Sequence, residues 1–398
     1  MESNTRNSSS EGNKTLQGVI YTISSLYAYL VRMHDRRKRR GIRYSLVTIL
    51  VVMILAKLCG LDNPYAIADW AQNRSEFLVE VLRLKCARLP HHSTYRRILE
   101  SVLDPDEFER MMSDFIQQCP EVGQEMVIAI DGKTLRGTIT QDDPFGLHLL
   151  AAYLPGEGIV LFQMVVEQEK ENEIVVVPQL LKSLDLRKKV VVADAMHAQR
   201  SLSLPIIQAG GDFVWIIQDN QLTTRQAIEL LLAPQKPLAG EGRPPMDFQI
   251  ARTNDKAHGR LEERTITVSS MLNDYLDWPG VAQVFKLERR FTHLASGAVE
   301  QDVRYGLTSL SSSQATPERL MNIVRSEWGI ENGLHYRRDV TFHEDATRIT
   351  HKTAGPTMAT INNLVSNLFA IQGFSNFAQA RRKFDAHPPQ ALAIILGL

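Results

Sequence analysis

The chain has 398 residues, 44% of them hydrophobic, which is enough to bury the cores of two or three domains. Its 45 basic and 45 acidic side chains give a formal net charge of zero, so whole-chain charge gives no sign of a polyanionic partner. Three cysteines (Cys59, Cys86 and Cys119) lack the paired spacings of a zinc site or a disulfide framework, which favours a reducing cytoplasm. The apolar run from Leu46 to Ala56 covers about half of a membrane span and predicts a buried helix.

The N-terminal part of the chain divides into a tail and a helical region. Residues 1–15 are rich in Asn, Ser, Glu and Gly, a composition that cannot bury a core, so we predict a disordered tail and no signal peptide. Residues 16–120 show helical periodicity with turn residues at Gly60 to Pro64 and around Pro90, and they lack the alternation of strands. This pattern predicts an all-helical domain.

A basic segment lies inside this helical region. From Arg32 to Arg43 the chain reads RMHDRRKRRGIR, in which Asp35 is the single acidic residue. Such a density of positive charge would neutralise several DNA phosphates, although a solvated charge run or an interdomain linker has the same composition. The candidate DNA contacts in the segment are Arg36, Arg37, Lys38, Arg39 and Arg40.

Two short segments of the same region, Pro64 to Gln72 and His91 to Leu99, predict helices separated by a third helix. The second segment opens on a Ser93 cap and carries Arg96 and Arg97. This layout is typical of a helix-turn-helix that reads DNA, and it makes the two arginines candidate DNA contacts. Helical packing with ordinary surface arginines is the alternative interpretation.

After Pro120 the sequence changes to short β-rich runs. The predicted strands are 127–131, 147–154, 159–166, 189–196 and 212–218. A tight turn joins the second strand to the third, and a helix is expected over 173–184. The order strand, hairpin, helix, strand, helix, strand predicts an α/β fold with an RNase H-like mixed sheet flanked by helices. A nucleotide-binding sheet is set aside because DGKTLRG, after the first strand, is not a glycine-rich phosphate loop.

The rest of the chain predicts an insertion and a second part of the α/β core. Residues 235–315 contain prolines, glycines and alternating segments, which indicate a β-rich insertion. A Thr316 cap followed by Pro317 begins a helix that continues to about Arg338. We therefore expect the α/β core to comprise residues 121–234 and 316–398, with C-terminal helices after the long helix.

Two of the predicted strands carry an aspartate at or near their end, Asp131 in VIAID and Asp194 in KVVVADAM. An aspartate there also commonly caps a helix or begins a turn. If the two strands are central neighbours, however, their carboxylates converge at one sheet edge, and such oxygen ligands suit Mg²⁺ or Mn²⁺. A third acid is expected from the long helix.

The long helix carries RSEWGIENGLHYRRD, in which Glu327, Glu331, His335 and Arg338 form one stripe at helical spacing. An ordinary amphipathic helix has the same appearance, so spacing alone does not select a catalytic residue. The neighbouring motifs do. AIDGKTLRGT, VVADAMHAQR, QDNQ, HGRLEER and WGIENGLHYRRDVTFHEDATR resemble the successive motifs of DDE-type insertion-sequence transposases, in the branch that includes H-repeat-associated proteins.

The resemblance extends from the RRKRRG segment to about Ala354 and implies a metal-binding triad of Asp131, Asp194 and Glu331. It also implies that the helical region is the family's associated DNA-binding domain. Glu327, together with Glu344 and Asp345, is a rival for the third carboxylate.

The implied function is transposition: metal-dependent cleavage of DNA and strand transfer at the ends of an insertion sequence. Two Mg²⁺ or Mn²⁺ ions would be held with Asp131 as the bridging ligand and with Asp194 and Glu331 on one ion each. Water would be the first nucleophile, and the released 3′-OH the second. The expected partners are double-stranded DNA, as terminal inverted repeats and target, and a second copy of the chain, since two DNA ends are joined. The expected location is the bacterial cytoplasm, at the nucleoid.

Several residues near the triad are candidate contacts for substrate. Lys133, Arg136 and Arg338 are candidate phosphate contacts, for which a salt bridge is the alternative. His197 and His335 would position water or DNA, for which a structural role is the alternative.

Two positions depart from the pattern of this branch. Gln218 stands where similar proteins usually carry lysine, and Glu327 stands where they usually carry histidine. One change removes a cation and the other adds an anion one helical turn from Glu331. A catalytically inactive, domesticated DNA-binding protein is therefore an alternative function, and an RNase H-like nuclease without strand transfer is another.

Overall fold

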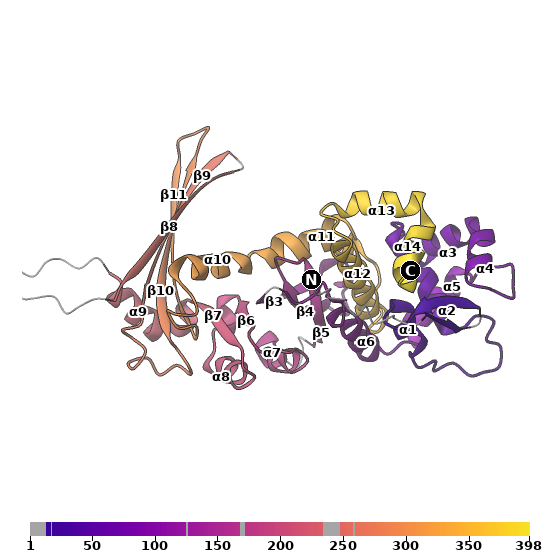
Figure 1. Ribbon diagram of the computed structural model, residues 1–398, viewed down its shortest axis with the longest axis horizontal. Coiled ribbons are helices and arrows are strands. Elements are labelled where there is room, and N and C mark those ends of the chain that lie inside the picture. The colour runs from indigo at the N-terminus through magenta and orange to yellow at the C-terminus, as the bar shows by residue number, and fades with distance from the viewer. Residues whose placement is uncertain (1–12, 17, 125, 168–171, 234–246, 258) are drawn as a thin grey trace, which may run out of the picture.

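The structure, a computed structural model, describes residues 13–16, 18–124, 126–167, 172–233, 247–257 and 259–398 (Figure 1). Within these residues, a nine-stranded sheet runs in the order β5-β4-β3-β6-β7-β11-β10-β9-β8, and a separate two-stranded hairpin lies near the N-terminus. Helices cover both faces of the large sheet. The mixed α/β architecture expected from the sequence is confirmed.

Five strands form the part of the sheet that the sequence predicted to be RNase H-like. They are β3 (Val127–Leu135), β4 (Leu147–Leu154), β5 (Ile159–Val166), β6 (Val190–Ala193) and β7 (Asp212–Ile217). β3, β4 and β5 pair antiparallel in sequence, whereas β6 and β7 run parallel to β3. β6 is shorter than predicted because a 3₁₀ turn, η2 (Ala195–His197), begins directly after Asp194.

Four further strands extend this sheet. They are β8 (Gln249–Ala257), β9 (Arg260–Ser269), β10 (Gln283–His293) and β11 (Val299–Thr308). β11 pairs antiparallel with β7, so these strands add to the sheet instead of forming one of their own. In Figure 1 they stand as a long twisted ribbon at one end of the molecule. Residues 235–246 of the predicted insertion lie outside the described residues.

The two faces of the sheet pack against different helices. On one face lie α7 (Glu173–Lys182), α8 (Arg200–Gln208) and α9 (Leu222–Leu231), which contact the strands of both halves of the sheet. On the other face, α10 (Pro317–Glu327) crosses β3, β6, β8 and β9 (Figure 1). Because successive side chains of a strand point to opposite faces of the sheet, a residue's position in the strand determines which helices its side chain contacts.

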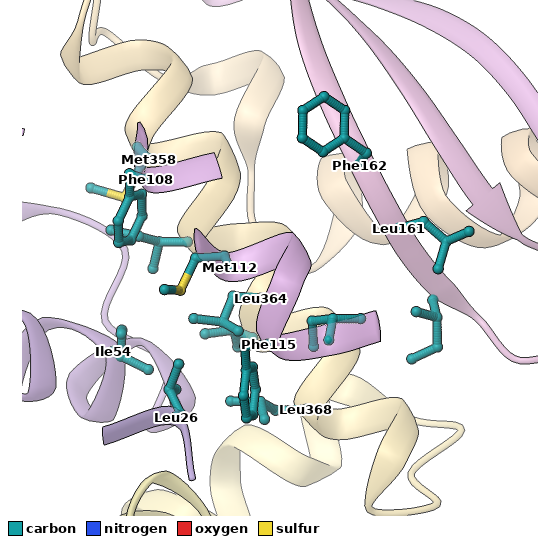
Figure 2. Packing of buried hydrophobic residues seen from close by; sticks show 14 of the residues in the cluster. Leu26, Ile54, Phe108, Met112, Phe115, Leu161, Phe162, Met358, Leu364 and Leu368 are labelled. Atoms are coloured by element: carbon teal, nitrogen blue, oxygen red, sulfur yellow. The ribbon is translucent and has the colours of Figure 1, made fainter. Parts of the chain in front are cut away.

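The N-terminal helices pack on the C-terminal ones. They are α1 (Leu26–Val31), α2 (Leu46–Leu58), α3 (Pro64–Asn73), α4 (Ser75–Val81), α5 (His92–Ser101) and α6 (Pro105–Gln117). The C-terminal helices are α12 (Ala354–Ile371), α13 (Phe377–Ala386) and α14 (Pro388–Leu396). Figure 2 shows Phe108 of α6 lying beside Met358 of α12, and Met112 and Phe115 of α6 lying beside Leu364 and Leu368 of α12. One hydrophobic core thus joins the N-terminal helices to the α/β part of the chain.

The N-terminal region differs from the sequence prediction in two details. β1 (Asn13–Leu16) pairs with β2 (Val19–Thr22), so the described end of the predicted tail is a hairpin and the region is not purely helical. Burial of Val19 and Tyr21 in the hydrophobic core stabilises this hairpin. Helix α5 is capped by His91 rather than Ser93: the His91 ring accepts the Ser93 backbone N–H. Residues 1–12 lie outside the described residues.

The predicted long helix is broken into three segments. After α10, a π-helical turn, η4 (Ile330–His335), is followed by α11 (Tyr336–Val340). A π-helical turn changes the angle between successive side chains, so the single stripe expected from regular α-helical spacing is not formed. Among the described residues, no helix has the length and apolar character needed to cross a membrane.

Candidate active site

Asp131 and Asp194 lie at the same level on neighbouring parallel strands. Ile130 of β3 pairs with Ala193 of β6, and each aspartate is the next residue along its own strand direction. The juxtaposition expected from the sequence is therefore present at this edge. Apolar β-forming residues before each aspartate bring the two positions together because both runs are buried in the centre of the sheet.

Side-chain alternation directs both aspartates to the face covered by α10. Val127 and Ala129 precede Asp131 by even steps and belong to the cluster that packs against α10 and η4, and Val190 and Val192 relate to Asp194 in the same way. Gln218 directly follows β7, the third strand in this row, and its side chain is exposed. Gln218, the position at which similar proteins usually carry lysine, thus lies at the same sheet edge as the two carboxylates.

The Asp131 carboxylate is held on both of its oxygens. Oδ1 accepts the backbone N–H of Gly132 at 2.9 Å, and Oδ2 lies 3.0 Å from Nε2 of His335. The Asp194 carboxylate accepts the backbone N–H of Ala195 at 2.6 Å, which is also the N-cap bond of the following 3₁₀ turn. Each carboxylate oxygen has two lone pairs, so these bonds orient the groups and leave acceptor capacity free.

Glu331 and Glu327 occupy different environments. Glu331 lies in the π-helical turn with an exposed side chain. Glu327 ends α10 and is half-buried; burial raises its pKa to about 7, Arg304 opposes the rise, and Asp194 and Asp131 add to it. Glu327 therefore lies close enough to both aspartates for their charges to affect it. This position is compatible with its being an alternative third carboxylate.

In the described residues, no three carboxylate, imidazole or thiolate groups lie close enough together to hold a metal ion as they stand. The residue types nevertheless fit a hard divalent cation, because Asp131, Asp194 and Glu331 offer only carboxylate oxygens. Burial is the main cause of the raised pKa of Glu327, and the charges of Asp194 and Asp131 add to it, a repulsion that a bound cation would offset.

A buried cluster that the sequence did not reveal lies behind the β3 strand. The Glu173 carboxylate, in the first turn of α7, lies 2.8 Å from Nε2 of His148 and 3.0 Å from Nε2 of His197. Burial acts to raise the pKa of Glu173, but hydrogen bonds from His148 and His197 outweigh it and lower the pKa to about 2. A Cβ atom on Gly132 would be 2.3 Å from Glu173 Oε1, so the cluster touches the backbone next to Asp131.

Glu173 could not have been identified from spacing, because its partners come from distant segments. His148 belongs to β4, and His197, which the sequence singled out, belongs to the turn after Asp194. His197 is structural in this arrangement, since its ring is buried and donates to Glu173.

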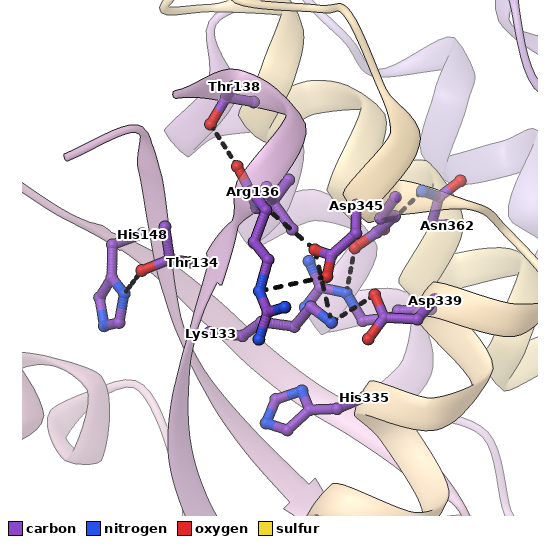
Figure 3. A network of polar contacts seen from close by, with 12 residues as sticks. Lys133, Thr134, Arg136, Thr138, His148, His335, Asp339, Asp345 and Asn362 are labelled. Atoms are coloured by element: carbon purple, nitrogen blue, oxygen red, sulfur yellow. Dashed lines mark hydrogen bonds and ion pairs between the residues drawn. The ribbon is translucent and has the colours of Figure 1, made fainter. Parts of the chain in front are cut away.

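All three predicted phosphate contacts near the triad are engaged in ion pairs, and two of them are Lys133 and Arg136. Lys133 forms an ion pair with Asp339, and Arg136 lies 3.8 Å from Asp345 (Figure 3). The Lys133 side chain is 10% exposed, whereas that of Arg136 is 83% exposed. Of these two cations, Arg136 is therefore the more accessible to solvent and to an incoming phosphate.

The assignment of Arg338 as a phosphate contact is not supported by its position. Its side chain is 1% exposed and forms a buried ion pair with Glu344, which also accepts from Asn362. The buried pair also takes Glu344 out of the candidates for the third metal-binding acid. The physical reason is that the π-helical turn and α11 direct Arg338 into the core beneath the sheet edge.

The candidate DNA contacts of the N-terminal region lie at its surface except Arg37, whose side chain is 13% exposed. Arg36 pairs with Asp104 at 2.8 Å and Arg37 with Asp35 at 2.7 Å, whereas the side chains of Lys38, Arg39 and Arg40 are exposed. Helices α3, α4 and α5 form the predicted arrangement of two helices separated by a third. Arg96 and Arg97 are exposed on α5.

Comparison with known proteins matches two families along the chain. The family described as "Transposase DDE domain" matches residues 123–368, and "DDE_Tnp_1-associated" matches residues 27–116. "Putative transposase YncI" of Escherichia coli O157:H7 is 28% identical over 358 residues, covering 87% of each chain. "H repeat-associated putative transposase YhhI" of Escherichia coli strain K12 is 27% identical over 353 residues, covering 87% of this chain and 90% of that one. The resemblance drawn from the motifs is confirmed.

One solved structure, a piggyBac transposase synaptic complex with hairpin DNA, is similar at a TM-score of 0.45 and 11% identity. The match covers 93% of this chain and 78% of that chain.

Proposed function

Because this chain belongs to the transposase DDE domain family, we propose that it cleaves DNA and transfers the cut strand at the ends of an insertion sequence, using divalent metal ions. The observation that carries the proposal is the placement of Asp131 and Asp194 at one level on adjacent strands, both facing the helix that leads to Glu331. The double-stranded DNA of the terminal repeats and target is the proposed substrate.

Asp131, Asp194 and Glu331 are the residues that would hold the ions. When bound, two Mg²⁺ or Mn²⁺ ions supply activation of an oxygen nucleophile and neutralisation of the leaving 3′ oxygen. The chain itself prepares the first ligand, because the Gly132 N–H and His335 fix the Asp131 carboxylate from two sides. Asp194 is fixed by the Ala195 N–H, while the exposed Glu331 is available to complete the set.

Other residues serve binding rather than bond cleavage. Arg136, exposed directly after the end of β3, would contact a phosphate of the bound DNA. Lys38, Arg39, Arg40, Arg96 and Arg97 would contact the flanking duplex through the N-terminal region. A homodimer on DNA is the proposed assembly, since two ends must be joined.

A DNA-binding function without cleavage is the second candidate, and Glu327 is the observation that favours it. A carboxyl group near Asp131 and Asp194 adds negative charge to a site that must also accept phosphate. This function requires metal-independent DNA binding and no strand cleavage.

The test is incubation of the protein with Mg²⁺ and the DNA flanking its own gene, together with the variants Asp131→Ala and Glu331→Ala. We expect metal-dependent cleavage by the wild type and a loss of at least about 100-fold in both variants. Mg²⁺ affinity measured by calorimetry should fall in parallel. Unchanged cleavage in either variant would overturn its assignment, and metal-independent binding without cleavage by the wild type would select the second function.

A further inference from the structure

The strands β8–β11 carry arginines on the sheet face that continues from α10. Arg264 of β9 pairs across from Arg289 of β10, and Arg289 pairs across from Asp302 of β11, so these three residues share one face. Toward the other end of β9 and β10 the same face is apolar, and Ile266 and Phe285 belong there to the cluster that packs against α10. The face therefore changes from apolar to positively charged where α10 ends.

A cavity of about 490 Å³ lies between this face and the end of α10. We call its basic lining the arginine cradle, which comprises Arg260, Arg264, Arg289, Arg304 and Arg325. The carboxylates that pair with these arginines are Asp255, Glu262 and Asp302. Even when Glu327, which interacts with Arg304 and Arg289, is added to these three carboxylates, the five guanidinium groups leave an excess of positive charge. Such a surplus in a hollow lined partly by apolar side chains attracts an anion.

Aromatic rings orient the guanidinium groups of the cradle. The Arg304 guanidinium lies 5.2 Å from the centre of the Trp328 ring, and that of Arg289 lies 5.9 Å from the same centre. The guanidinium groups of Arg260 and Arg289 lie 4.9 Å and 5.6 Å from the centre of the Phe291 ring. Because the rings and the paired carboxylates hold the arginines in place, little side-chain entropy remains to be lost on binding.

The cradle adjoins the carboxylate edge through Glu327. Glu327 interacts with the charges of Arg304 and Arg289 as well as with those of Asp194 and Asp131, and the next residue, Trp328, lines the cavity. Trp328 follows Glu327 directly at the end of α10 and is 43% exposed. A strand that leaves the carboxylates toward β8–β11 would therefore meet the cradle next.

We propose that the arginine cradle binds the phosphates of the DNA strand that extends from the Asp131–Asp194 edge, with Trp328 as the platform that positions Arg304. This inference rests on the proposed function and gives the strands β8–β11 a role in holding substrate. Guanidinium groups suit phosphate oxygens, which accept their planar donors in pairs.

The test is the salt dependence of DNA binding in the presence of EDTA, which separates binding from cleavage. The probe is a synthetic duplex of the DNA flanking the gene, and the variant is Arg304→Gln combined with Arg325→Gln. The slope of log K against log salt should fall by about 0.9 for each phosphate that no longer has a cationic partner, or about 1.8 in total. Arg304→Lys, which keeps the charge, should retain most of the slope.

The matched control is Arg290→Gln, on the same strand as Arg289 but on the opposite face, with a side chain 53% exposed. Its slope should equal that of the wild type. An equal decrease in this control, or no decrease in the doubly substituted variant when circular dichroism shows both folded, would overturn the proposal. A competition experiment gives a further outcome that would overturn the proposal. If millimolar mononucleotide abolished DNA binding by the wild type but not by the doubly substituted variant, the cavity would be a site for a free nucleotide. If the wild type bound DNA through the cradle but showed no Mg²⁺-dependent cleavage, the proposed function would be contradicted. The proposed contact between the cradle and DNA would still be supported.

Discussion

His335 Nε2 lies 3.0 Å from Asp131 Oδ2, so the segment that carries Glu331 is tied directly to the strand that carries the first aspartate. A side chain that orients a metal ligand typically contributes 10–100-fold to metal affinity or activity. We expect His335→Ala to lower Mg²⁺-dependent cleavage by about that factor, and His335→Gln, which can still donate, to lower it less. Calorimetric Mg²⁺ affinity should follow the same order; equal losses in the two variants would argue against an orienting role.

Glu173 should make a large contribution to stability. Glu173→Ala removes the acceptor of two buried imidazole N–H groups, each costing about 1–3 kcal/mol when left unpaired. We expect the free energy of unfolding in urea to fall by about 3 kcal/mol, and by less in Glu173→Gln, which keeps one acceptor oxygen. Gly132→Ala should also destabilise the protein, since its Cβ atom would be 2.3 Å from Glu173 Oε1. A stable Glu173→Ala protein would show that the histidines find other partners.

Arg338 and Arg136 should respond in opposite ways to truncation. Arg338→Ala leaves Glu344 buried without its cation, and removal of one partner of a buried pair costs about 3–5 kcal/mol. Arg136→Ala should change stability by no more than about 0.5 kcal/mol, because its side chain is 83% exposed, and should weaken DNA binding. Thermal unfolding and DNA titration of both variants separate the two roles. Normal stability of Arg338→Ala with weakened DNA binding would restore it as a phosphate contact.

Glu109 predicts a pH dependence of stability. Burial raises its pKa to about 7, despite hydrogen bonds from Thr360 and the Gln163 N–H, from an ordinary value of 4.5. Since the folded-state pKa is the higher one, its contribution is fully present below about pH 4.5 and is lost as pH rises through about 7.

Glu109→Gln does not titrate, so its stability relative to the wild type should rise by about 3 kcal/mol over this range. Urea unfolding of both proteins at several pH values measures the difference. A difference that does not change with pH would show that folding does not raise the pKa of Glu109.

The strands and the two aspartates were predictable because their signals are local. Runs such as those around Val127 and Val190 indicate buried strands by composition alone, and an aspartate at the end of each run indicates the shared edge. The motifs then supplied the family, which the comparisons confirm. Glu331 as the third acid stays a prediction.

The features that sequence reasoning missed are an irregular helical turn and contacts between distant segments. The π-helical turn alters the register between Glu327 and His335, and regular helical spacing carries no sign of it. The burial of Arg338 requires Glu344 and Asn362 to be brought together in three dimensions. The hairpin at β1 and β2 is short, and its stability comes from packing on the helical core, which a local pattern does not show.

The most direct test of the central claim is the metal dependence of Asp131→Cys. If Asp131 binds the catalytic ions, a thiolate at this position should abolish Mg²⁺-supported cleavage of the flanking DNA and restore part of it with Mn²⁺, because sulfur is a poor ligand for Mg²⁺. Asp142→Cys, an exposed aspartate in a loop, is the control and should cleave with both ions like the wild type. Undiminished Mg²⁺-dependent cleavage by Asp131→Cys would contradict the assignment of Asp131 as a metal ligand.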